Sequence, residues 1–262
     1  MEAMLDMDTH NHLKELARFM ASYATAMLSA GATTSRIERC VQRITRAHGV
    51  DADLSILPKR ILITVWDKEH THNYSLVGQT HTDGINLNTS TLLSHLSHQI
   101  EDGMTLEQAL ARQAEILRQP RINHWLVILM TSVANMSFCQ LFGGDLEAMA
   151  IVLIATAAGF TYKEKLVQWH WESKLVVIIS SLISALIGTS GFVLGVSATP
   201  EIALGTSVLW LVPGIRYINS ISDMLRGHYL VAQSRIAEAL IITICLSLGL
   251  CLALLIANIR WF

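Results

Sequence analysis

The chain has 262 residues, of which 52% are hydrophobic, and its mean hydropathy is +0.41. Charged residues make up 15%, below the roughly 25% usual in soluble domains, which argues against a wholly soluble protein. The net charge of −2 gives no indication of a nucleic-acid partner. The 4 cysteines form no CxxC pair, and we interpret them as small buried hydrophobes rather than disulfides or metal ligands.

Charges and histidines are dense in the first 121 residues and scarce from residue 125 onward. This asymmetry predicts an α+β soluble domain over residues 1–120, followed by an all-α polytopic membrane domain over residues 121–262. The N-terminus is acidic and polar, without a basic stretch leading into an apolar core, so we expect no cleaved signal peptide.

The soluble part opens with two predicted helices. Apolar residues recur at helical spacing over residues 12–30, and Gly31 ends this helix. Ser35 and Glu38 fit a capping box, which would open a second helix that runs to about His48.

Strands and two further helices complete this part. Short runs rich in Ile, Leu, Val and aromatic residues predict three strands, at residues 53–57, 60–66 and 74–77. After a turn at Asp83-Gly84, helices are expected at residues 89–101 and 105–118. The order ααβββαα indicates a compact α+β domain.

Long apolar runs separated by short turns dominate the second half of the chain. A helix needs about 20 mostly apolar residues to cross the hydrocarbon core of a bilayer. Segments near this length lie at residues 125–142, 146–162, 175–196, 202–221 and 236–258. The fourth is interrupted by Pro213-Gly214, so it is a broken span or an interfacial segment.

Basic residues in the loops predict the orientation. The turns at residues 143–145 and 197–201 contain neither Lys nor Arg. The loops on the other side carry the basic residues Arg118, Arg121, Lys163, Lys165, Lys174, Arg226 and Arg235. Because basic loops stay in the cytoplasm, we expect about five spans with the N-terminus inside and the C-terminus outside.

The interrupted fourth span is the most informative segment for function. Pro213 cannot donate a backbone hydrogen bond and Gly214 loosens the chain, so the helix should break there. A half-helix that starts near Ile215 would direct its partly positive N-terminus and the Arg216 guanidinium toward an anionic group. Asn219 and Asp223 would then line the path. Alternatively, Pro213-Gly214 ends the span and Arg216 marks the membrane interface.

Other candidate sites give weaker signals. The pairs His70/His72 and His95/His98 have chelating spacing but lack a recognisable third ligand, so we interpret them as surface histidines. No GxSxG, HExxH, P-loop or GxGxxG sequence occurs, so we assign no catalytic residues, metal or cofactor and do not expect an enzyme. The polar residues Asn135, Gln140 and Glu147 are secondary candidates, which more often join helices together.

Three segments of the chain resemble the threonine/serine exporter family: residues 28–38 (LSAGATTSRIE), residues 84–87 (GINL), and residues 211–214 (LVPG) with Asn219, Asp223 and Gly227 after them. More closely, the chain looks like the larger subunit of a two-component C4-dicarboxylate exporter of the enterobacterial type.

The resemblance implies a bacterial inner-membrane exporter with a cytoplasmic N-terminal domain and a small carboxylate, succinate foremost, as substrate. Single-chain members carry more spans than this sequence, so the resemblance also implies a smaller, YjjB-like membrane subunit as partner. Threonine or serine export is the alternative within this class. A membrane-anchored cytoplasmic hydrolase or sensor is the alternative of another class, and a homo-oligomer that works alone is a further one.

Overall fold

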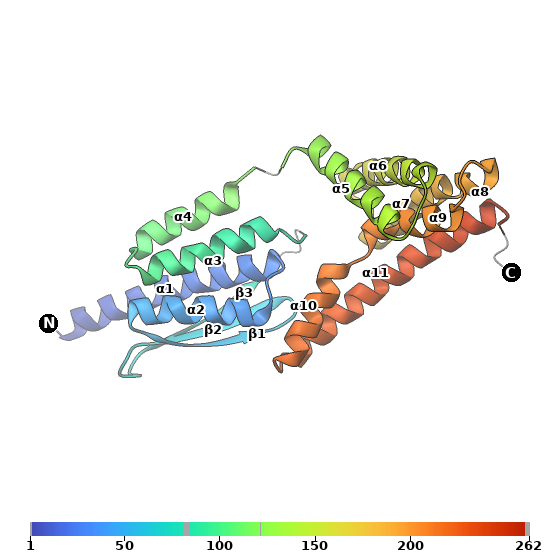
Figure 1. The fold of residues 1–262 in the computed structure, drawn as a ribbon. Coiled ribbons are helices and arrows are strands. Elements are labelled where there is room, and N and C mark those ends of the chain that lie inside the picture. Colours follow the sequence, from blue (N-terminus) through green and yellow to red (C-terminus); the bar gives the residue numbers. More distant parts are fainter. Residues whose placement is uncertain (1, 81–83, 121, 260–262) are drawn as a thin grey trace. The chain divides into compact units, whose positions relative to one another are not determined.

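The structure is a computed structural model that describes residues 2–80, 84–120 and 122–259, with side chains from His10 onward. The chain forms two compact units (Figure 1). The first consists of Met1–Pro120 together with Ile215–Ile236, and the second of Arg121–Gly214 together with Ala237–Phe262. The turn residue Asp83 and the loop charge Arg121 lie outside the described residues.

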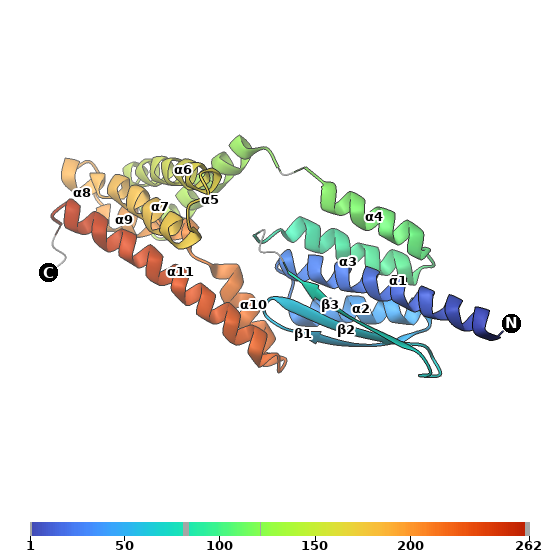
Figure 2. The same ribbon diagram turned by 180° about the vertical axis from the view of Figure 1, so that it is seen from behind.

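The first unit is the expected α+β fold. Its elements are α1 (Glu2–Ser29), α2 (Thr34–His48), β1 (Asp51–Ile56), β2 (Arg60–Trp66), β3 (Asn73–Gln79), α3 (Leu87–Glu101) and α4 (Leu106–Arg118). The strands form one antiparallel sheet in the order β1-β2-β3. Figures 1 and 2 show α1 and α2 lying against this sheet, with α3 and α4 stacked on their far side.

The core of this unit lies between the sheet and α1. Ile61, Ile63 and Val65 alternate along β2 and are fully buried, whereas Leu62 between them is exposed. Successive strand side chains point to opposite faces, so one face of the sheet packs on the helices. A capping box opens α4, since the Thr105 side chain accepts from the Gln108 N–H and the Gln108 side chain accepts from the Thr105 N–H.

The capping box expected at Ser35 and Glu38 is wrong. Helix α2 begins at Thr34, so Ser35 lies inside the first turn, where it is buried. Thr33 occupies the N-cap position but its side chain makes no capping hydrogen bond. The acceptor that caps this helix comes from a distant part of the chain.

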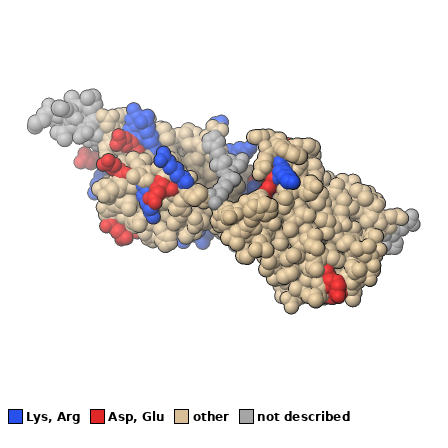
Figure 3. All heavy atoms as spheres, turned by 90° about the horizontal axis from the view of Figure 1, so that it is seen from above, with Lys and Arg blue, Asp and Glu red and all other residues tan. Residues whose placement is uncertain are grey.

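The second unit is helical. It contains α5 (His124–Leu141), α6 (Leu146–Gln168), α7 (Ser173–Gly188), α8 (Ser190–Leu194), α9 (Pro200–Ser207), the 3₁₀ turn η1 (Leu209–Leu211) and most of α11 (Tyr229–Ile256). On the face drawn in Figure 3, charged side chains gather over the first unit and are few over the second.

Four helices in the described part of the chain are long and apolar enough to cross a membrane: His124–Leu141, Leu146–Gln168, Ser173–Leu194 and Tyr229–Ile256. They correspond to the first, second, third and fifth expected spans. The fourth expected span is divided into α9, η1 and α10 (Gly214–Leu225), with the interruption at Pro213, where we expected it. The number of spans and their orientation stay predictions.

Candidate functional site

The helix break at Pro213-Gly214 has a definite local structure. After η1, Val212 is extended (φ −62°, ψ 127°), and α10 begins at Gly214. The Gly214 N–H donates to the Val212 carbonyl at 2.8 Å, which tightens the bend. Because the first N–H groups of a helix lack partners within that helix, α10 opens with its partly positive end at the break. The break and the start of a helix close to Ile215 are therefore as predicted, whereas the place of this helix in the membrane stays a prediction.

The five predicted site residues lie at different positions, from the bend before α10 to its last turn. Pro213 is half-buried and Gly214 is exposed, both at the start of the helix. Arg216 lies on its first turn and is half-buried. Asn219 and Asp223 are one turn apart, and the structure brings these two together with the α1–α2 loop.

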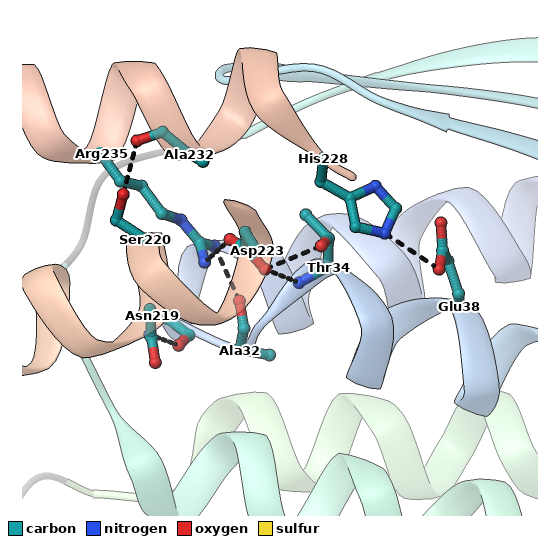
Figure 4. A network of polar contacts seen from close by, with 10 residues as sticks. Ala32, Thr34, Glu38, Asn219, Ser220, Asp223, His228, Ala232 and Arg235 are labelled. Carbon is teal, nitrogen blue, oxygen red and sulfur yellow. Dashed lines mark hydrogen bonds and ion pairs between the residues drawn. The ribbon is translucent and has the colours of Figure 1, made fainter. Parts of the chain in front are cut away.

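The Asp223 carboxylate is the centre of a buried polar network (Figure 4). Its side chain is fully buried, and its Oδ1 accepts from the Thr34 N–H at 3.0 Å and the Thr34 hydroxyl at 2.8 Å. Its Oδ2 accepts from Arg235 at 2.6 Å, and the same guanidinium donates to the Ala32 carbonyl at 2.7 Å. Asn219 Nδ2 donates to the Gly31 carbonyl, also at 2.7 Å.

The network explains why α2 needs no cap of its own. Gly31 turns the chain at the end of α1 with φ +86°, a conformation that favours glycine. Thr34 then starts α2 with its N–H directed at Asp223. A carboxylate at a helix N-terminus satisfies a donor and interacts favourably with the helix dipole. Asp223 therefore performs the role that the sequence had suggested for Ser35.

Two further contacts join the same elements. The Ser220 hydroxyl donates to the Ala232 carbonyl at 2.7 Å, which ties α10 to α11. His228 lies 3.3 Å from a carboxylate oxygen of Glu38 on α2 (Figure 4). Sequence reasoning had counted Arg235 only as a loop charge, and no local spacing links it to Asp223.

Polar groups also meet inside the second unit. Asn135 on α5 donates to the Thr156 hydroxyl on α6 at 2.7 Å and to the Thr206 carbonyl on α9 at 2.9 Å. Asn135 thus joins three helices, as expected of a buried amide in a membrane protein. Gln140 and Glu147, the other secondary candidates, are exposed.

The histidine pairs lie on the surface of the first unit. His70, His95 and His98 are exposed, and His72 is half-buried. His70 pairs with Asp51 at 3.0 Å. Among the described residues, no group of three His, Cys, Asp or Glu side chains could hold a metal ion.

Comparison with known proteins identifies the family. The family model described as "Putative threonine/serine exporter" matches residues 18–257, most of the chain. The chain belongs to the threonine/serine exporter family. No solved structure matches it.

Individual relatives within this family carry two kinds of name. The chain is 29% identical, over 89% of its length and 91% of the relative's, to "Probable succinate transporter subunit YjjP" of Escherichia coli K12. It is 27% identical to the protein of the same name from Klebsiella aerogenes, over 94% and 96% of the two lengths. It is 21% identical to "Threonine/serine exporter" of Corynebacterium glutamicum, covering 92% of this chain but 51% of that protein.

Family membership gives the network a context. This exporter-family chain is a membrane protein, and residues of the first resembling segment contact Asn219 and Asp223 within the first unit. Gly31, Ala32 and Thr34 belong to the first of these segments, and Asn219 and Asp223 follow the last one. The network therefore joins the N-terminal α+β fold to α10 and the start of α11.

Proposed function

We propose that this chain is the larger subunit of a bacterial inner-membrane exporter of small carboxylates, with C4-dicarboxylates such as succinate preferred. The observation that carries the proposal is the helix break at Pro213-Gly214, with Arg216 on the first turn of α10. The chain matches two relatives over about nine-tenths of their length, and the names of these relatives support the substrate class. In this proposal the N-terminal α+β part of the chain, residues 1–120, lies in the cytoplasm, because the basic loops are on its side of the membrane.

The chemistry of the break suits a carboxylate. An arginine offers two parallel N–H donors that match the two carboxylate oxygens, and a helix N-terminus adds backbone donors. Broken helices supply substrate sites in many secondary transporters because they place such groups inside the membrane. Arg216 would hold one carboxylate, and Asn219 and Asp223 would border the path on the same helix.

Asp223 has a more restricted role in this proposal than the sequence suggested. Both of its oxygens are engaged, by Thr34 and by Arg235. A coupling proton driven by the proton-motive force would therefore reach Asp223 only after the Arg235 contact opens.

Export of threonine or serine is the second candidate, favoured by the description of the family model and by the Corynebacterium relative. An amino acid brings an ammonium group, which requires a carboxylate partner. Asp223 already pairs with Arg235, and Glu147 is exposed at the start of α6. This arrangement supports the carboxylate substrate over the amino acid. Competition between succinate and threonine for efflux in vesicles separates the two.

The binding role of Arg216 is tested by efflux from cells loaded with labelled succinate. Arg216→Ala should lower efflux about 10- to 100-fold, since hydrogen bonds to charged groups are worth about 1.5–3 kcal/mol. Arg226→Ala is the matched control, because Arg226 is exposed just beyond the end of α10. Unchanged efflux from Arg216→Ala at equal expression would show that the substrate does not bind there.

We also propose a smaller, YjjB-like membrane subunit as partner, together with the lipid bilayer. The word "subunit" in the names of both YjjP relatives supports a second component. Affinity purification of the tagged chain from its native membrane should recover a second, smaller membrane protein in fixed ratio. Recovery of the chain alone with full efflux activity after reconstitution would instead establish a homo-oligomer.

A further inference from the structure

His124 and Glu164 form an ion pair at one end of the helical second unit, between imidazole Nδ1 and carboxylate Oε2. His124 is the first residue of α5, and Glu164 lies near the end of α6. Sequence reasoning ended the second span at residue 162, but α6 continues to Gln168. Glu164 therefore lies on a helix that is long and apolar enough to cross a membrane.

The carboxylate of this pair depends on the imidazole. Oε2 of Glu164 is buried, and apart from its contact with His124 it has no hydrogen-bond partner among the described residues. The imidazole side chain is 41% exposed, so it reaches water while it contacts the buried oxygen. Ionisable residues on membrane helices are costly, and chains of Asp, Glu and His form proton relays in transporters.

Glu164 differs from the other carboxylates of the candidate spans. The four helices that could cross a membrane carry Glu147, Glu164 and Glu238, of which Glu147 and Glu238 are exposed and Glu164 is half-buried. Asp223 on α10 is fully buried, but both of its oxygens are engaged in the closed network. A proton can therefore exchange at Glu164 through its imidazole partner while that network stays closed.

The other ionisable groups on the elements packed against α6 are exposed or lie at its far end. At the same end as the pair, the exposed members are Tyr162, Lys165, His170, Glu172 and Lys174. Glu172 and Lys174 pair with each other at 3.7 Å. Glu201 and Cys139 lie at the far end, near the Asp145 cap that opens α6. The half-buried charge beside the pair is Lys163, whose charge interacts with that of Glu164.

Lys163 connects the pair to the helix break. Its Nζ is 5.4 Å from the centroid of the Trp210 ring, and Trp210 belongs to η1, three residues before Pro213. A change of charge at Glu164 therefore acts on a cation that contacts the segment just before the break. An exporter driven by protons requires such a link between its proton site and its substrate path.

We propose that His124 and Glu164 carry the coupling proton of export. This inference rests on the proposed function, in whose orientation this end of α5 and α6 faces the cytoplasm, where an inward-moving proton is released. A proton on the Glu164 carboxyl passes to imidazole Nδ1, the carboxylate becomes ionised, and the imidazolium releases a proton from its other ring nitrogen to water. Imidazole groups ordinarily change charge between about pH 5 and 8, so the ring can accept and release a proton at cellular pH.

The test uses the full chain, with any subunit that co-purifies, in liposomes whose lumen is more acidic than the outside. Protons that leave the lumen should drive succinate inward, and one proton per substrate sustains about a tenfold accumulation for each pH unit at zero membrane potential. Glu164→Gln should abolish this accumulation, because glutamine has the shape of a protonated carboxyl but cannot release a proton. Exchange of labelled for unlabelled succinate, which requires no net proton movement, should continue.

Two variants separate proton transfer from a structural role, and a third is the control. His124→Gln should lose most of the initial rate of accumulation, and imidazole added to the buffer should restore part of it, because a diffusible base can replace the missing ring. Glu164→Asp keeps a titratable group and should still accumulate succinate, at a lower rate. Glu147→Gln is the matched control, because Glu147 is exposed at the other end of the same helix.

The possible failures are distinguishable. Absence of succinate exchange in the wild type would refute the proposed function itself. Wild-type exchange without accumulation, or full accumulation in Glu164→Gln, would refute this inference alone. Equal loss of exchange and accumulation in both Glu164→Gln and His124→Gln, without rescue by imidazole, would assign the pair a structural role and also overturn the inference.

Discussion

Replacing Asp223 by Asn tests whether the buried network holds α2 to α10. Asparagine keeps the size of the side chain, and its carbonyl oxygen can still accept from Thr34. The Oδ2 position becomes an NH₂ group that faces the Arg235 guanidinium, so two hydrogen-bond donors face each other. Arg235, whose side chain is only 15% exposed, then loses its ion pair with Asp223 and keeps its hydrogen bond to the Ala32 carbonyl.

The magnitude follows from these contacts. Removing one partner of a buried ion pair costs about 3–5 kcal/mol, because the other charge stays buried without compensation. The introduced asparagine retains the Thr34 hydrogen bond and Arg235 is partly hydrated, so we expect the lower end, about 3 kcal/mol. At 1.4 kcal/mol per tenfold change, local opening should become about 100-fold more frequent.

Hydrogen–deuterium exchange of the detergent-solubilised full chain measures this opening. Peptides that cover residues 30–40 and 215–236 should exchange about 100-fold faster in Asp223→Asn, while peptides from the sheet should not change. Ser222→Ala, a neighbouring half-buried change on α10, is the control. The double variant Asp223→Asn/Arg235→Gln should be no worse than the first single variant, because the guanidinium that faced the new NH₂ group is gone. Unchanged exchange in Asp223→Asn, or effects that simply add, would refute the reasoning.

Two other changes test packing and electrostatics elsewhere. In the second unit, Gly249→Ala would press a methyl group against the Ile178 carbonyl, so we expect a loss of about 1–3 kcal/mol, seen as a lower melting temperature. Gly205→Ala, with nothing described within 4 Å of the added carbon, should leave it unchanged. Hydrogen bonds, first from the Thr71 hydroxyl, lower the pKa of Asp67 from 3.8 to about 2. A carboxyl whose pKa is lower in the folded than in the unfolded state stabilises the folded state at pH values above its unfolded pKa. Asp67 should therefore stabilise the β2–β3 turn above pH 4, and this effect should be lost as the pH falls through 2. An NMR titration in which the Asp67 carboxyl has a midpoint near pH 4 would contradict this prediction.

Local patterns in the sequence predicted much of the fold. The apolar spacing of α1 and the alternation in β2 are properties of neighbouring residues, so they can be recognised without the tertiary structure. The start of α1 was placed ten residues too late, because polar residues at a helix end leave no apolar stripe. The break at Pro213-Gly214 was also predictable, since a proline lacks the N–H that a helix requires.

Contacts between distant residues were decided by the tertiary structure. Asp223 and Thr34 are 189 residues apart, and no spacing in the sequence indicates that this carboxylate caps that helix. Lys163 looked like a loop charge, and only the packing of α6 against η1 places it on Trp210. The sequence by itself determined where helices, strands and the break lie, because backbone chemistry is local. The partners of the buried charges follow from how the helices pack, because an ion pair depends on distance in space and not on distance along the chain.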